Sequence, residues 1–151
     1  MTRISLLLSA IVALVVISAG CITGQQVVQV SESSEIIVNG EISVGAGEME
    51  FYQFSVPDNA QSARVTGMFA ASGGTDNDIQ VLILDEGSFF QWKKENSAPS
   101  IYDSGRATTQ SFSIGIPAGT YYLVYSNKFS TFSIKGVKTK VDLTYQFNSS
   151  S

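Results

Sequence analysis

The chain has 151 residues, a formal net charge of −4 and 44% hydrophobic residues, which is the composition of one globular domain rather than of a disordered segment. With nine Lys and Arg against thirteen Asp and Glu, it lacks the clustered positive charge that nucleic-acid binding requires, so no nucleic-acid partner is expected. It has no histidine and a single cysteine, which excludes a histidine-based catalytic triad, an intrachain disulfide and a thiolate metal cluster.

The N-terminus has the pattern of an export signal. Arg3 supplies a positive charge, residues 4–17 form an apolar run, and three small residues then precede Cys21, the only cysteine. This arrangement resembles the processing site of prokaryotic lipoproteins. The resemblance implies that residues 1–20 are a lipoprotein signal peptide and that Cys21 carries the lipid. An uncleaved membrane anchor and an ordinary signal peptide cut near Ala19 are the alternatives.

All three interpretations place the remainder of the chain outside the cytoplasm. Lipidation of Cys21 would anchor it to the cell membrane, either on the cell surface or at the periplasmic face. Residues 21–34 are polar and rich in Ser and Gln, so we expect a flexible tether with at most one early strand.

Residues 35–147 alternate short β-rich runs with clusters of Gly, Pro, Asn and Asp, which is typical of an antiparallel β-sandwich or jelly roll. We expect about eight strands, a tight hairpin turn at Asn39-Gly40 and a disordered tail over residues 148–151. No segment shows a helical period, and residues 86–100 (EGSFFQWKKENSAPS) are expected to be irregular.

Two runs are apolar at nearly every position, residues 79–85 (IQVLILD) and 120–127 (TYYLVYSN), which predicts central strands buried on both faces. The tyrosines of the second run are therefore expected in the core, with a ligand platform as the alternative. Asn127 is expected to cap the turn that follows through its side-chain amide. The last run, residues 137–147, alternates apolar and polar side chains with a period of two.

The order of these runs resembles the GOLD (Golgi dynamics) domain group and the prepeptidase C-terminal domains of secreted proteases. The similarity covers about residues 50–145, and the runs "NDIQVLILD" and "PAGTYYLV" are its most specific parts. It implies a compact β-sandwich with a non-catalytic role in protein or membrane-associated interaction. Such motifs specify a fold more than an activity.

One stretch stands out as a candidate for partner binding because it combines aromatic and cationic side chains between two expected strands. It comprises Phe89, Phe90, Trp92, Lys93 and Lys94. The alternative is that its aromatic side chains close one open end of the sandwich while the lysines stay in solvent.

Acidic side chains provide only minor candidates. Asp76 and Asp78 could contribute oxygen ligands to Ca²⁺, or could bond to backbone amides within their turn; no metal or other cofactor is expected. Glu48 and Glu50 could form a carboxylate pair, although a solvated strand edge explains them better than a catalytic pocket. Asn148 begins an Asn-Ser-Ser glycosylation sequon.

Together these patterns predict a lipid-anchored, non-catalytic binding module that presents a β-sandwich to an unknown protein or glycan. One alternative is a structural subunit of a cell-surface assembly that pairs through an edge strand. Another is a small exported hydrolase that uses carboxylates.

Overall fold

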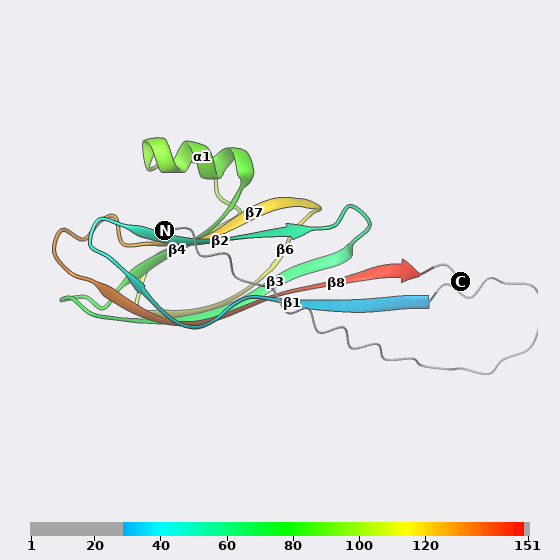
Figure 1. The fold of residues 1–151 in the computed structure, drawn as a ribbon, viewed down its shortest axis with the longest axis horizontal. Helices are drawn as coiled ribbons and strands as arrows, with labels where there is room; N and C mark the ends of the chain where they lie inside the picture. The colour runs from blue at the N-terminus through cyan, green and yellow to red at the C-terminus, as the bar shows by residue number, and fades with distance from the viewer. Residues whose placement is uncertain (1–28, 150–151) are drawn as a thin grey trace, which may run out of the picture.

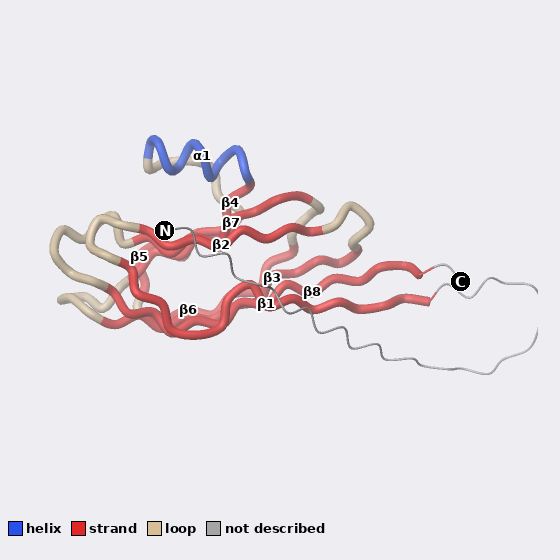
Figure 2. The backbone as a smooth tube through the Cα atoms, viewed as in Figure 1, coloured by secondary structure: helices blue, strands red, loops and turns tan. Residues whose placement is uncertain are grey.

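The computed structural model describes residues 29–149, which fold into two antiparallel sheets packed face to face (Figures 1 and 2). The elements in chain order are β1 (Gln29–Val44), β2 (Met49–Val56), β3 (Gln61–Ser72), β4 (Ile79–Asp85), α1 (Glu86–Glu95), β5 (Tyr102–Ala107), β6 (Thr109–Gly115), β7 (Gly119–Ser126) and β8 (Lys135–Ser149). The first sheet has the order β1-β8-β3-β6 and the second β2-β7-β4-β5. The predicted eight-stranded antiparallel sandwich is therefore confirmed. The predicted signal peptide and Cys21 lie outside the described residues.

The core lies between the sheets and follows the period of two of the strands. Along β3 every second residue is buried, and on β8 Val137, Val141 and Leu143 are fully buried. Strands β4 and β7 are buried on both faces, as their sequences predict. Their inner side chains join the main core, while Leu84 and Val124 on the outer face pack beneath α1.

The helix α1 corrects the expectation of an irregular segment at residues 86–100. The side chain of Asp85 accepts a hydrogen bond from the backbone N–H of Ser88 at 2.8 Å and so caps the first turn. Asn96 ends the helix in the left-handed conformation, with φ of 55°. With only ten residues, the helix is too short for an apolar period to stand out in the sequence. Within residues 29–149, no helix is long and apolar enough to cross a membrane.

The predicted turn at Asn39-Gly40 is wrong. Both residues lie inside β1, paired with Lys140 and Thr139 of β8, and the chain turns only after Val44. Gly40 has a φ of 154°, so the glycine adapts an extended strand to its partner instead of reversing the chain.

The ends of the sandwich also extend beyond the predicted boundaries. Residues 29–34, expected in the tether, pair with residues 144–149 of β8, which include the first residues of the expected tail. Backbone hydrogen bonds form this ladder, and they do not require apolar side chains. The composition of these two polar segments therefore concealed a regular strand pair.

Candidate functional site

The helix α1 lies on the outer face of the second sheet (Figure 1). Two of the predicted partner-binding residues are buried there: Phe89 is 1% exposed and Trp92 is 4% exposed. The ring of Phe89 stacks on the ring of Tyr122 from β7, with centroids 3.9 Å apart and planes 3° apart. Phe89 and Trp92 therefore attach the helix to the sheet, and a partner cannot reach them without displacing the helix.

The other predicted residues remain on the surface. Phe90 is 57% exposed, and Lys93 and Lys94 are exposed beside it. Phe51 of β2, which the sequence did not indicate as a site residue, is 43% exposed, and its ring centroid lies 5.0 Å from that of Phe89. We call the surface formed by Phe51, Phe90 and Lys93 the aromatic surface.

The aromatic surface has a rigid base. The rings of Phe51 and Phe90 lie 6.1 and 6.2 Å from the ring of Tyr122, so both are supported by the same buried stack. The Nζ atom of Lys93 lies 5.5 Å from the centroid of Phe51 and 5.4 Å from that of Phe89, which is cation–π distance. The surface thus offers two exposed apolar rings and one ammonium group, which lies near the ring of Phe51.

Lys128, at the start of the β7–β8 loop, holds the C-terminal end of α1. Its Nζ atom donates to Oδ1 of Asn96 at 2.6 Å and lies 4.7 Å from the centroid of the Trp92 ring. The helix is therefore held at its first turn by Asp85 and at its last turn by Lys128. This explains how a ten-residue helix keeps one position on the sheet.

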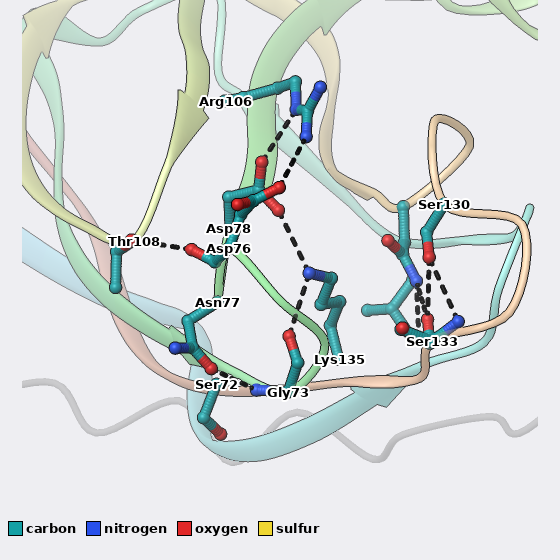
Figure 3. A network of polar contacts seen from close by, with 12 residues as sticks. Ser72, Gly73, Asp76, Asn77, Asp78, Arg106, Thr108, Ser130, Ser133 and Lys135 are labelled. Atoms are coloured by element: carbon teal, nitrogen blue, oxygen red, sulfur yellow. Dashed lines mark hydrogen bonds and ion pairs between the residues drawn. The ribbon is translucent and has the colours of Figure 1, made fainter.

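The turn that contains Asp76 and Asp78 forms a network of ion pairs at one end of the sandwich (Figure 3). Asp78 is 6% exposed; its Oδ1 accepts from Nζ of Lys135 at 3.0 Å and its Oδ2 accepts from Nε of Arg106 at 2.7 Å. Asp76 lies farther out, 3.6 Å from the same guanidinium. Burial disfavours the charged form of Asp78, but the hydrogen bonds and charges of Lys135 and Arg106 outweigh it and lower the pKa of this carboxyl.

Both carboxylate oxygens of Asp78 are thus occupied by cations rather than free for calcium. Among residues 29–149 no three His, Cys, Asp or Glu side chains are grouped closely enough to hold a metal ion. The buried Lys135, which is 3% exposed, was missed in the sequence. A signal was present, because Lys135 shares the inward period of Val137, Val141 and Leu143 on β8.

The remaining candidates do not converge on a cleft. Glu48 and Glu50 are both exposed, and Asn148 is exposed on β8. A shallow groove of about 500 Å³ crosses the outer face of the first sheet. Its lining includes Met68, Lys138 and Lys140 but only one aromatic residue, Phe69, whose side chain is 2% exposed and belongs to the core.

No protein-family model and no curated protein sequence matches the chain. Among solved structures, the chain is similar to the crystal structure of PliG from Aeromonas hydrophila, a periplasmic lysozyme inhibitor of g-type lysozyme. The two share 10% sequence identity with a TM-score of 0.36, over 80% of this chain and 92% of that protein. A similarity of this size does not indicate a shared function.

Proposed function

We propose that this protein is an extracytoplasmic, lipid-anchored binding module that catalyses no reaction and holds a protein partner on its aromatic surface. The export signal and the lone Cys21 support the location and the anchor. One observation carries the binding role: the rings of Phe51 and Phe90, which are 43% and 57% exposed, both contact the buried ring of Phe89 and so form one apolar patch.

The geometry favours a protein over a glycan. Phe51 and Phe90 are tilted by 55° and 60° against Phe89, so neither ring continues the plane of the stacked Phe89 and Tyr122 rings as a platform for a sugar ring would. Small polar ligands also need several converging hydrogen-bonding groups, whereas this surface consists of two apolar rings and the ammonium of Lys93 near Phe51. An apolar protein segment with an acidic side chain complements both features. Because both rings are already about half buried, complete burial of each would contribute about half of the roughly 1.5–3 kcal/mol of a fully exposed phenylalanine.

A structural subunit that pairs through an edge strand is the second candidate. The strand β1 has sixteen residues and lies at the edge of its sheet, which favours strand addition. However, Glu32, Glu35 and Glu41 lie along it, and acidic residues on an edge oppose pairing between identical copies. The binding module therefore explains the surface better.

Site-specific photocrosslinking tests the proposal. A photoreactive phenylalanine analogue replaces Phe90 in the full chain, expressed in its native cells. The matched control replaces Met68, which is 56% exposed on the outer face of the opposite sheet. We expect one discrete protein adduct at position 90, its loss when Lys93→Glu is added, and no such adduct at position 68.

Identical adducts at both positions, or no protein adduct at position 90, would contradict the aromatic surface as a binding site. The anchor is tested separately by labelling with a fatty-acid analogue. Label should enter the wild-type protein and be absent from the Cys21→Ser variant.

A further inference from the structure

A second surface lies at the far end of the sandwich. The β1–β2, β3–β4 and β7–β8 loops gather at the end opposite to Gln29 and Ser149, where the described chain begins and ends (Figure 1). The β7–β8 loop, residues 127–134, presents Phe132 with 92% exposure and Ile134 with 63% exposure. These two are the most exposed large apolar side chains among residues 29–149. Phe132 makes no contribution to the core of the domain.

The apex of this loop is closed by its own hydrogen bonds. Oγ of Ser130 accepts from the backbone N–H of Ser133 at 3.1 Å and lies 3.2 Å from the carbonyl oxygen of Ser133. The backbone N–H of Ser130 donates to the carbonyl of Asn127 at 3.0 Å. Phe132 therefore projects from a closed turn rather than from an open loop.

Beneath the apex, buried polar groups tie the loop to its neighbours (Figure 3). The side-chain amide of Asn127, which is fully buried, donates to the carbonyls of Val44, Gly45 and Ser133 at 3.3, 3.0 and 2.7 Å. Lys135 donates to Asp78 and, at 2.9 Å, to the carbonyl of Gly73. The Asn127 bonds thus join the β7–β8 loop to the β1–β2 loop, and the Lys135 bonds join the start of β8 to the β3–β4 loop.

The loop is also held from its side. The guanidinium of Arg106 bonds Asp78 and lies 4.2 Å from the centroid of the Phe129 ring. A loop whose backbone is fixed in this way loses little backbone entropy on binding, so less of the free energy of burying Phe132 is spent on ordering the loop. Aromatic residues are enriched among the hot spots of protein interfaces, where their side chains become fully buried by the partner.

We propose that Phe132 and Ile134 form a contact tip that inserts into a concave apolar pocket on a protein, separate from the partner of the aromatic surface. The shape of the partner's site follows from the exposure of Phe132. A side chain that is 92% exposed projects from the surface, so the surface that encloses it must be concave. A bilayer fits less well, because the charged side chains of Asp76 and Arg106, 69% and 54% exposed, lie at the same end and would have to leave water.

A second copy of the chain also fits less well. Two convex tips placed against each other bury far less than the roughly 1,200 Å² of a stable interface. Residues 21–151 contain thirteen acidic and eight basic residues, which gives a net charge of −5. This charge makes two copies of the chain, or one copy and an anionic bilayer, repel each other.

The test places the photoreactive analogue at Phe132 in the full chain in its native cells, with Asn59 as the control position. Asn59 is exposed in the β2–β3 turn at the opposite end of the sandwich. We expect a protein adduct at position 132 that is absent at position 59. An adduct with lipid, an adduct of twice the chain mass, or no adduct would overturn the proposal.

The protein found in the adduct is then purified and titrated calorimetrically with the full-length protein in detergent. We expect Phe132→Ser to weaken binding at least tenfold without changing the melting temperature, because its side chain packs against nothing, and Phe51→Ser to leave this affinity unchanged. Equal affinity of Phe132→Ser and wild type would overturn the contact tip. Loss of affinity with Phe51→Ser alone would assign this partner to the aromatic surface and likewise overturn it.

Discussion

Replacing Asp78 by Asn should destabilise the domain by about 3–5 kcal/mol at pH 7, because it leaves the ammonium of Lys135 buried without a counter-charge. Lys135 is 3% exposed, and its remaining partners would be the carbonyl of Gly73 and a neutral amide. Arg106 contributes less to this loss, because its side chain is 54% exposed and can turn toward water. A loss of this size is a large part of the 5–15 kcal/mol that stabilises a typical domain.

Urea unfolding followed by the fluorescence of Trp92, the only tryptophan, measures this loss. The matched control is Asp142→Asn, which removes a partly exposed ion pair with Lys140 at 3.7 Å and should cost less than about 1 kcal/mol. The double variant Asp78→Leu/Lys135→Met should recover much of the stability, since replacing a buried ion pair by apolar groups is often neutral.

The pH dependence provides a second check. The pKa of Asp78 is lowered in the folded protein, so its contribution to stability is complete above the unfolded value of 3.8 and is lost as the pH falls through the folded pKa. Wild type and Asp78→Asn should therefore converge in stability in acid. A loss below 1 kcal/mol at pH 7, or a difference that stays constant through the acid range, would refute the reasoning.

Further predictions concern the helix and the core. Phe89→Ala should cost about 3–5 kcal/mol in urea unfolding and Phe90→Ala less than about 1, since only Phe89 is buried; equal losses would contradict the packing of α1. Asp85→Ala should cost about 1 kcal/mol through loss of the helix cap, whereas Asp85→Asn should keep most of it. Gly67→Ala should reduce the free energy of unfolding by about 1–3 kcal/mol through overpacking, because a Cβ there would lie 2.9 Å from the side chain of Val141. The loss should be visible as a lower melting temperature. Burial raises the pKa of Tyr125 above its ordinary 10.0, so its contribution to stability is complete below pH 10 and falls as the pH rises toward the folded pKa. Absorbance at 295 nm should show this tyrosine ionising only when the domain unfolds. Ionisation near pH 10 in the folded protein would contradict its burial.

The sequence predicted the sheet architecture well because strand periodicity is a local property. The apolar runs of β4 and β7 and the alternation along β8 have the burial that they predicted. Asn127 also bonds Ser133 of the loop that follows it through its side-chain amide, as expected. Local patterns sufficed for these features.

The features that the sequence did not predict depend on contacts between distant segments. Phe51 and Phe90 are 39 positions apart in the numbering and come to one surface because both rings lie near Tyr122 of β7, on which α1 packs. The pairing of Lys135 with Asp78 joins residues 57 positions apart. The strand pair at the ends of the chain is a ladder of backbone groups, which composition does not reveal. Contacts of this kind become visible once the topology is known.

The strands β1 and β8 lie side by side along fifteen registered residue pairs, from Gln29 with Ser149 to Val44 with Lys135. If Gln29 were pulled against the β7–β8 loop at the opposite end of the sandwich, the force would run parallel to the strands. The whole β1–β8 ladder would then resist the force in shear (Figure 1). A pull on both ends of the described chain, which lie together, would instead open the same ladder one rung at a time. The domain should therefore be mechanically strong along the direction in which the proposed anchor and partner would load it.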